Sequence, residues 1–134
     1  MGAWGSSAFD NDDAADWAWG LDDDGDGALV RSALVLDDVE YVELPEGATA
    51  IAAAEIVAAC LGRPGAHPLP DAVQAWVDAH GSAFRGGDAA SALNAVRRVA
   101  AEGSELSELW AETEDQDWAR AVDDLTTRLS AVAS

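Results

Sequence analysis

An acidic run, Asp22-Asp-Asp-Gly-Asp-Gly27, has the residue types and the spacing of a cation site. Asp22, Asp24 and Asp26 alternate and Gly27 follows, which matches positions one, three, five and six of a calcium-binding loop. The twelfth position, where such a loop places a bidentate glutamate, is Ala33. The pattern therefore gives weak calcium binding as one hypothesis and an ordinary acidic loop between helices as the alternative.

A second acidic cluster precedes this run, and two tryptophans flank it. Its members are Trp4, Asp10, Asp12, Asp13, Asp16 and Trp17. Asp12 and Asp16 are four residues apart and share a helical face, so they could meet one cation or one arginine, or act as an acid–base pair if burial raised one pKa. The alternative is structural, because Asp10 suits a helix N-cap and acids in the first turn complement the helix dipole.

Patterns typical of catalysis are missing from the rest of the chain. The two histidines, His67 and His80, have no second histidine or cysteine three or four residues away, and no nucleophile elbow, phosphate-binding loop or dinucleotide fingerprint occurs. No catalytic residue and no cofactor besides calcium is predicted. The single cysteine, Cys60, cannot form an internal disulfide, so a reducing cytoplasm is the expected compartment.

The charge balance is strongly acidic and uneven along the chain. Twenty-six acidic residues face seven arginines and no lysine, for a net charge of −19. Residues 1–46 hold thirteen of the acids and one base, Arg31, a net charge of −12. This field repels nucleic acid and anionic membranes, so neither is an expected partner, and it favours a basic protein. The alternative is that the acidity serves solubility alone.

These residues must be positioned by helices, because apolar side chains recur at helical spacing along most of the chain. Residues 1–9, with two large aromatics, are expected to form an arm docked on the body, and a helix should follow to about residue 21. Residues 28–36 place apolar side chains at helical spacing, at Leu29, Ala33 and Leu36. The clearest helix is expected over residues 46–61, and Gly62 should end it.

The second half of the chain repeats this pattern of caps and apolar stripes. Pro70 suits a helix first turn, Asp88 is expected to cap the next helix, and Ser104 a short one. The last helix should carry the stripe Trp118, Val122, Leu125, Leu129 and Val132. The sequence thus predicts an all-α protein, a compact single-domain bundle of six or seven short helices over residues 1–134.

The start of the chain resembles a known family. The strings Met1-Gly-Ala-Trp-Gly and Phe9-Asp-Asn-Asp-Asp-Ala-Ala-Asp-Trp17 are similar to the opening of the bacterial family called domain of unknown function 4259. The resemblance continues at residues 41–45, 52–58 and 104–110 and so covers nearly the whole chain. It implies a bacterial, cytosolic, mostly helical protein. It implies no activity and assigns no catalytic residue.

Three hypotheses about function follow. The first is a non-enzymatic protein-interaction module, in an accessory, inhibitor or immunity-type role, that binds a basic partner through residues 1–46. The second is a weak calcium-binding module that uses the loop from Asp22 to Gly27. The third is an enzyme that uses Asp12, Asp13 and Asp16.

Overall fold

The computed structural model describes residues 16–23, 27–36, 40–65, 69–112 and 117–133. These residues form six α-helices and two 3-10 helices with defined bounds, preceded by a helical stretch at residues 16–18. Outside the helices they make one isolated β-bridge. The predicted all-α class and the compact bundle are therefore confirmed. In chain order the elements are η1 (Trp19–Asp23), α2 (Ala28–Ala33), α3 (Leu44–Cys60), α4 (Asp71–His80), η2 (Gly81–Ala83), α5 (Gly86–Ala100), α6 (Glu105–Ala111) and α7 (Asp117–Val132). The predicted docked arm, residues 1–9, lies outside the described residues.

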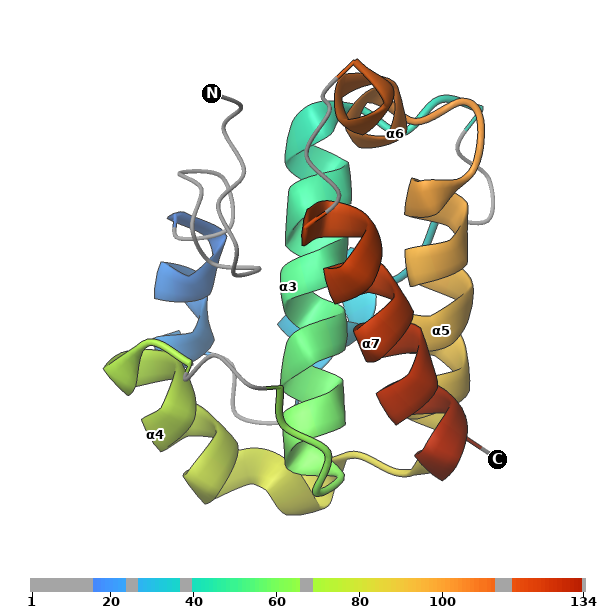
Figure 1. The fold of residues 1–134 in the computed structure, drawn as a ribbon. Coiled ribbons are helices and arrows are strands. Elements are labelled where there is room, and N and C mark those ends of the chain that lie inside the picture. Colours follow the sequence, from blue (N-terminus) through green and yellow to red (C-terminus); the bar gives the residue numbers. More distant parts are fainter. Residues whose placement is uncertain (1–15, 24–26, 37–39, 66–68, 113–116, 134) are drawn as a thin grey trace.

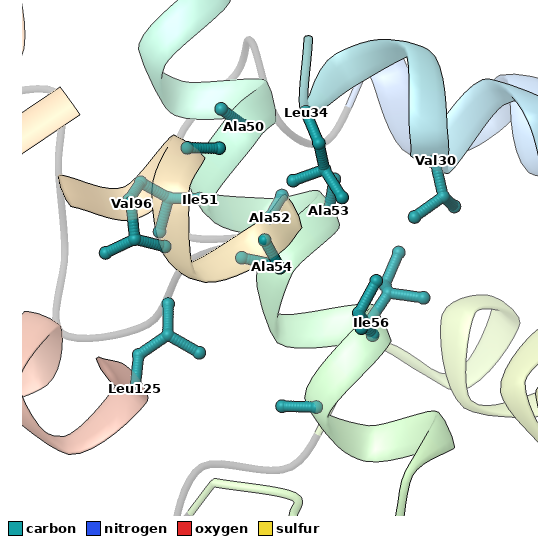
Figure 2. Packing of buried hydrophobic residues seen from close by; sticks show 14 of the residues in the cluster. Val30, Leu34, Ala50, Ile51, Ala52, Ala53, Ala54, Ile56, Val96 and Leu125 are labelled. Carbon is teal, nitrogen blue, oxygen red and sulfur yellow. The ribbon is translucent and has the colours of Figure 1, made fainter. Parts of the chain in front are cut away.

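Helix α3 is the centre of the bundle and contacts α2, α4, α5, α6 and α7 (Figure 1). Its interior is buried on every side, and most of the buried residues are alanines: Ala48, Ala50, Ala52, Ala53, Ala54 and Ala58. Figure 2 shows side chains of α2, α5 and α7 reaching this helix from different directions. One-carbon side chains let the neighbouring helices approach α3 closely. Because helices pack around it on several sides, α3 has no continuous solvent-facing stripe.

Helix α2 turns a different face inward from the one predicted. Val30 is fully buried and Leu34 is 6% exposed, whereas Leu29 and Ala33 are only partly buried. The helix is short: it ends at Ala33, so the predicted stripe could not continue to Leu36 as one helical face. Figure 2 shows Val30 and Leu34 directed at α3. Leu36 is nevertheless buried, as a non-helical residue after the helix.

Two helix ends confirm the expected stop and cap signals. Gly62 adopts φ +85°, directly after the last turn of α3, in the left-handed conformation that favours glycine. Ser104 is the N-cap of α6, and its hydroxyl oxygen accepts a hydrogen bond from the Ser107 amide at 3.5 Å.

In α7, Leu125 and Leu129 are buried as predicted, while the side chain of Trp118 lies outside the described residues.

The prediction that Asp88 is the N-cap of its helix is wrong by three positions. Helix α5 begins at Gly86 with Arg85 as N-cap, and Asp88 reaches back so that its Oδ2 accepts the Arg85 amide at 2.9 Å. The other oxygen, Oδ1, accepts Nε of Arg31 at 3.0 Å, which ties α2 to the start of α5. Partial burial alone would raise the pKa of Asp88, but these hydrogen bonds and the charges of Arg31 and Arg85 hold that pKa below its ordinary value.

Replacing Asp88 with asparagine is therefore expected to destabilise the fold by about 1 kcal/mol at pH 7, a value that allows for solvent screening at the half-exposed Arg31. A carboxylate whose folded-state pKa is lowered contributes its stability above the unfolded-state pKa, near 3.8, and loses it as pH falls through the folded-state pKa. In urea unfolding, the difference in the free energy of unfolding between the variant and wild type should be smaller at pH 3 than at pH 7. Asp78→Asn, at an exposed position in α4, is the control, and a pH-independent difference would contradict the assignment.

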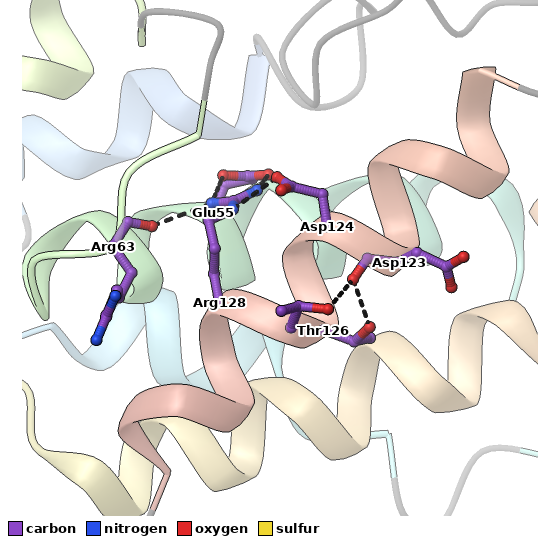
Figure 3. Close-up of polar contacts among 7 residues, drawn as sticks. Glu55, Arg63, Asp123, Asp124, Thr126 and Arg128 are labelled. Atoms are coloured by element: carbon purple, nitrogen blue, oxygen red, sulfur yellow. Dashed lines mark hydrogen bonds and ion pairs between the residues drawn. The ribbon is translucent and has the colours of Figure 1, made fainter.

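A second polar network joins the two long helices of the core (Figure 3). The Arg128 guanidinium of α7 binds both carboxylate oxygens of Glu55 in α3, with Nη2–Oε1 at 2.7 Å and Nη1–Oε2 at 2.9 Å. It also donates to Asp124 Oδ2 at 2.7 Å and to the Arg63 carbonyl at 3.1 Å. The side chains of Arg128 and Glu55 are 12% and 18% exposed. The ion pair is thus largely withdrawn from water and fixes how α7 sits on α3.

Candidate functional site

Most of the predicted N-terminal site lies outside the described residues. Trp4, Asp10, Asp12 and Asp13 belong to that part, so the acid–base hypothesis and the arm are not decided by the structure. Two members of the cluster are described. Asp16 is exposed, and Trp17 is partly buried against the core; both lie in a short helical stretch, residues 16–18, that leads into η1.

The candidate calcium loop is described only at its edges. The backbone of Asp22 belongs to η1, Asp24 and Asp26 lie outside the described residues, and Gly27 adopts φ +85°. Helix α2 starts directly after Gly27, at Ala28. A calcium loop uses the carbonyl of its seventh residue, here Ala28, but a residue in the first turn of a helix directs its carbonyl along that helix. Calcium binding stays a prediction, and this helix start counts against it.

The end of the bundle where α6 crosses the start of α3, at the top of Figure 1, is built from two segments rich in glutamate. We call this surface the acidic end. Its seven glutamates come from residues 40–46 and from residues 102–112, two segments that contain no lysine or arginine: Glu40, Glu43, Glu46, Glu102, Glu105, Glu108 and Glu112. All are exposed except Glu105, which is partly buried. Residues 40–46 belong to the acidic N-terminal third, and α6 extends that acidity across the fold.

A short parallel bridge and one arginine hold the two segments of the acidic end together. The Val42 amide donates to the Gly103 carbonyl at 2.9 Å, and the Glu105 amide donates to the Val42 carbonyl at 2.8 Å. Arg98 of α5 donates to the backbone carbonyls of Glu40 and Gly103, each at 3.1 Å. Arg98 thus binds main-chain oxygens of both segments and fixes the positions from which the glutamates project.

Glu105 links α6 to α3 by supplying a cap that α3 lacks. The N-cap residue of α3, Glu43, makes no side-chain capping bond, but the Leu44 amide donates to Glu105 Oε1 at 2.9 Å. The carboxylate therefore satisfies one of the free amides at the positive end of α3. The helices are also close here, since a Cβ on Gly47 would lie 3.1 Å from Leu106 Cδ1. These contacts hold α6 against the start of α3.

Tyr41 stands among these carboxylates and is held by one of them. Its hydroxyl donates to Glu108 Oε2 at 2.5 Å. The hydrogen bond to Glu108, followed by slight desolvation and the charges of Glu108, Glu105 and Glu43, raises the pKa of Tyr41 to about 12. The aromatic ring is 44% exposed, so the acidic end presents a positioned aromatic side chain to the solvent.

Replacing Glu108 with glutamine is expected to lower the pKa of Tyr41 toward 10, because the main cause of the shift is removed. Tyr41 is the only tyrosine in the chain, so a spectrophotometric titration of tyrosinate reports on this residue alone. Glu112→Gln, which removes a charge that the Tyr41 hydroxyl does not bind, is the matched control. An unchanged pKa in Glu108→Gln, with circular dichroism showing an intact fold, would contradict the hydrogen bond.

One hollow on the described surface lies beside hydroxyls that bond to their own helix. A groove of about 530 Å³ between α5 and α7 is bordered by Arg97, Ala100 and Asp123. The hydroxyls of Thr126 and Thr127 in it donate to the Asp123 carbonyl at 2.9 and 2.8 Å, so they serve their own helix (Figure 3). In the described part of the chain no group of three histidine, cysteine or acidic side chains could hold a metal ion.

The remaining groups that could do chemistry have structural surroundings. Burial raises the pKa of the Cys60 thiol to about 11, so at neutral pH it is a thiol and not a nucleophilic thiolate. His80 ends α4 as expected for a residue near a helix C-terminus, with Nδ1 3.1 Å from the Trp76 carbonyl and its ring stacked on Trp76 at 4.8 Å. Neither residue forms part of a catalytic constellation among the described residues.

Sequence reasoning missed the part of this surface that α6 contributes. The spacing Glu105-Glu108-Glu112, opposite the buried Leu106 and Trp110, is a local signal and could have marked α6 as an acidic helix face. The meeting of α6 with residues 40–46 has no such signal, because the two segments are separated by about sixty positions, as in the Leu44–Glu105 bond.

The fold and the surface define a class of protein: an all-helical bundle with one strongly acidic end. A family model described as a domain of unknown function, DUF4259, matches residues 2–121, and the chain belongs to this family. No curated protein and no solved structure matches the chain. In the described part of the chain, no helix is both long and apolar enough to cross a membrane.

Proposed function

We propose that this chain is a non-enzymatic protein-interaction module that binds a basic protein through its acidic N-terminal third. One observation carries the proposal. Arg31 is the only base in residues 1–46, and its guanidinium is bound to Asp88, a residue outside that third. The third thus carries thirteen acids against one base, a net charge of −12, and that base also binds an acid from another part of the fold. A surface of this kind attracts a cationic partner and speeds its association.

The described acids of this third are available to a partner. Asp16, Glu40, Glu43 and Glu46 are all exposed. An accessory, inhibitor or immunity-type role fits a small acidic module of this kind. The proposal also assigns the protein to a bacterial cytoplasm, on the strength of the family resemblance and of a single, unpaired thiol at Cys60.

Affinity capture from the native host at low salt, followed by a salt gradient, tests this function. We expect a basic protein to be retained and to elute with rising salt, because exposed charge pairs are screened. Neutralising three acids of the third, by Glu40→Gln, Glu43→Gln and Glu46→Gln, should weaken retention more than neutralising three exposed acids elsewhere, by Asp71→Asn, Asp78→Asn and Asp123→Asn. Recovery of no basic protein, or equal loss in the two variants, would remove the support for the proposal.

A further inference from the structure

The acidic end carries exposed apolar side chains as well as charge. Among the described residues the large hydrophobic side chains most open to solvent are Trp19, Val35, Tyr41 and Leu109. Two of these four, Tyr41 and Leu109, lie within the acidic end, 44% and 36% exposed. An exposed apolar side chain on its own needs no explanation, but two of them inside a field of carboxylates have the composition of a binding surface with an apolar centre and a polar rim.

The helical repeat of α6 determines which of its side chains face the solvent. Leu106 and Trp110 are buried against the bundle, which turns Glu108, Leu109 and Glu112 outward. Residues three and four apart are neighbours on a helix, so Glu112 lies on one side of Leu109 and Glu105 on the other. Tyr41 joins this face through its hydrogen bond to Glu108.

The chemistry of the surface selects the kind of ligand. A small cation needs several carboxylates that converge on one point, and no described group of three does so. Spread carboxylates around a tyrosine and a leucine instead match a protein segment that presents both cationic and apolar side chains, as an amphipathic helix does. A nucleic acid lacks the positive charge, and a lipid surface of anionic head groups would be repelled.

Resting on the interaction function proposed above, we propose that the acidic end docks a basic, amphipathic helical segment of another protein. Tyr41 and Leu109 contact apolar side chains of that segment, and the surrounding glutamates pair with its lysines and arginines. The surface is suited to this because it is preformed: the bridge at Val42 and the Arg98 contacts hold it without the partner. Tyrosine at the centre of an interface is also a common source of binding energy.

Two synthetic probes test the docking site on the full chain. The first is a helical peptide with lysines on one face and leucines on the other, and the second is an oligolysine of equal charge. Binding is measured by calorimetry at low salt, and its location by chemical-shift mapping of the labelled protein. We expect the amphipathic peptide to bind more tightly than oligolysine and to shift amides of residues 40–46 and of α6.

Variants separate the apolar contacts from the charge. Tyr41→Ser with Leu109→Ser should weaken binding of the amphipathic peptide by about tenfold or more. The matched control, Ala72→Ser with Ala79→Ser, changes two exposed apolar side chains of α4, outside both the acidic end and residues 1–46. It should leave affinity within about twofold of wild type, as is usual for positions outside the interface. Circular dichroism verifies that both variants are folded.

The possible failures are distinguishable. If the peptide binds in a salt-sensitive manner but shifts only residues 16–36, or if the Tyr41/Leu109 variant binds it normally, the docking site is wrong while the interaction function stands. Equal affinity for oligolysine also overturns the docking site, because the apolar side chains would then contribute nothing. If neither probe binds at low salt, both the docking site and the proposed function lose their support.

Discussion

Replacing Arg128 with leucine is expected to lower the free energy of unfolding by about 3 kcal/mol. The change removes the cation from a carboxylate, Glu55, that is only 18% exposed and is bound through both of its oxygens. A buried carboxylate that loses its partner keeps the full cost of its desolvation. Burial of Arg128 opposes its charged form, but Glu55 and Asp124 outweigh this effect and hold its pKa above the ordinary value. Denaturant unfolding at pH 7 measures the loss.

A companion set of variants shows that the cost comes from the stranded carboxylate. Adding Glu55→Gln to Arg128→Leu should recover a substantial part of the loss, since the uncompensated charge is then gone. Arg128→Lys should fall between wild type and leucine, because an ammonium cannot bind both oxygens of Glu55 in the same planar fork. Arg97→Leu, at an exposed position of α5, is the control. A loss below about 1 kcal/mol for Arg128→Leu, the value of an exposed pair, would contradict a buried structural role.

Enlarging an alanine of the central helix is expected to cost a similar amount. Ala54 is fully buried in α3 and faces α5 and α7, near Val96 and Leu125 in Figure 2. A leucine there adds three carbons where helices are already in contact, so the neighbours must shift or adopt strained rotamers. We expect Ala54→Leu to destabilise the fold by about 3 kcal/mol, the upper part of the range for overpacked cores. Thermal and denaturant unfolding measure it.

The matched control for this substitution is Ala75→Leu. Ala75 lies on the exposed face of α4, and alanine and leucine have similar helix propensity, so the change should be close to neutral there. The difference between the two variants isolates packing from propensity. If Ala54→Leu were as harmless as Ala75→Leu, the close approach of α5 and α7 to α3 would be wrong.

Only features determined by local patterns could be predicted from the sequence. The helical stop at Gly62, the cap at Ser104 and the buried face through Leu125 and Leu129 each depend on residues within a few positions of one another. The start of α5 was misplaced because Asp88 suits both an N-cap and the third position of a helix. Only the fold decides between the two, through the partner Arg31 on α2.

The contacts that define the candidate site could not be predicted, because each joins segments far apart in the chain. Glu55 and Arg128 are 73 positions apart, and Tyr41 and Glu108 are 67 apart. No periodicity links such pairs, so sequence reasoning located the acidity in the N-terminal third but could not see that α6 completes the surface. For the same reason, no local signal in the sequence marks Leu109 as part of this exposed surface.

The alanines of α3 also have a thermodynamic consequence. A side chain fixed in a core loses rotamer freedom, at a cost of about 0.5–1 kcal/mol for a leucine or isoleucine and nothing for an alanine. The most buried helix of this protein is therefore made largely of residues that have no side-chain conformational entropy to lose. Each alanine buries little apolar area, but no loss of side-chain entropy offsets the free energy gained by that burial. The high helix propensity of alanine further stabilises the helix. The larger side chains that do lose freedom include Ile51 and Ile56 within α3 and Leu125 and Leu129 on α7.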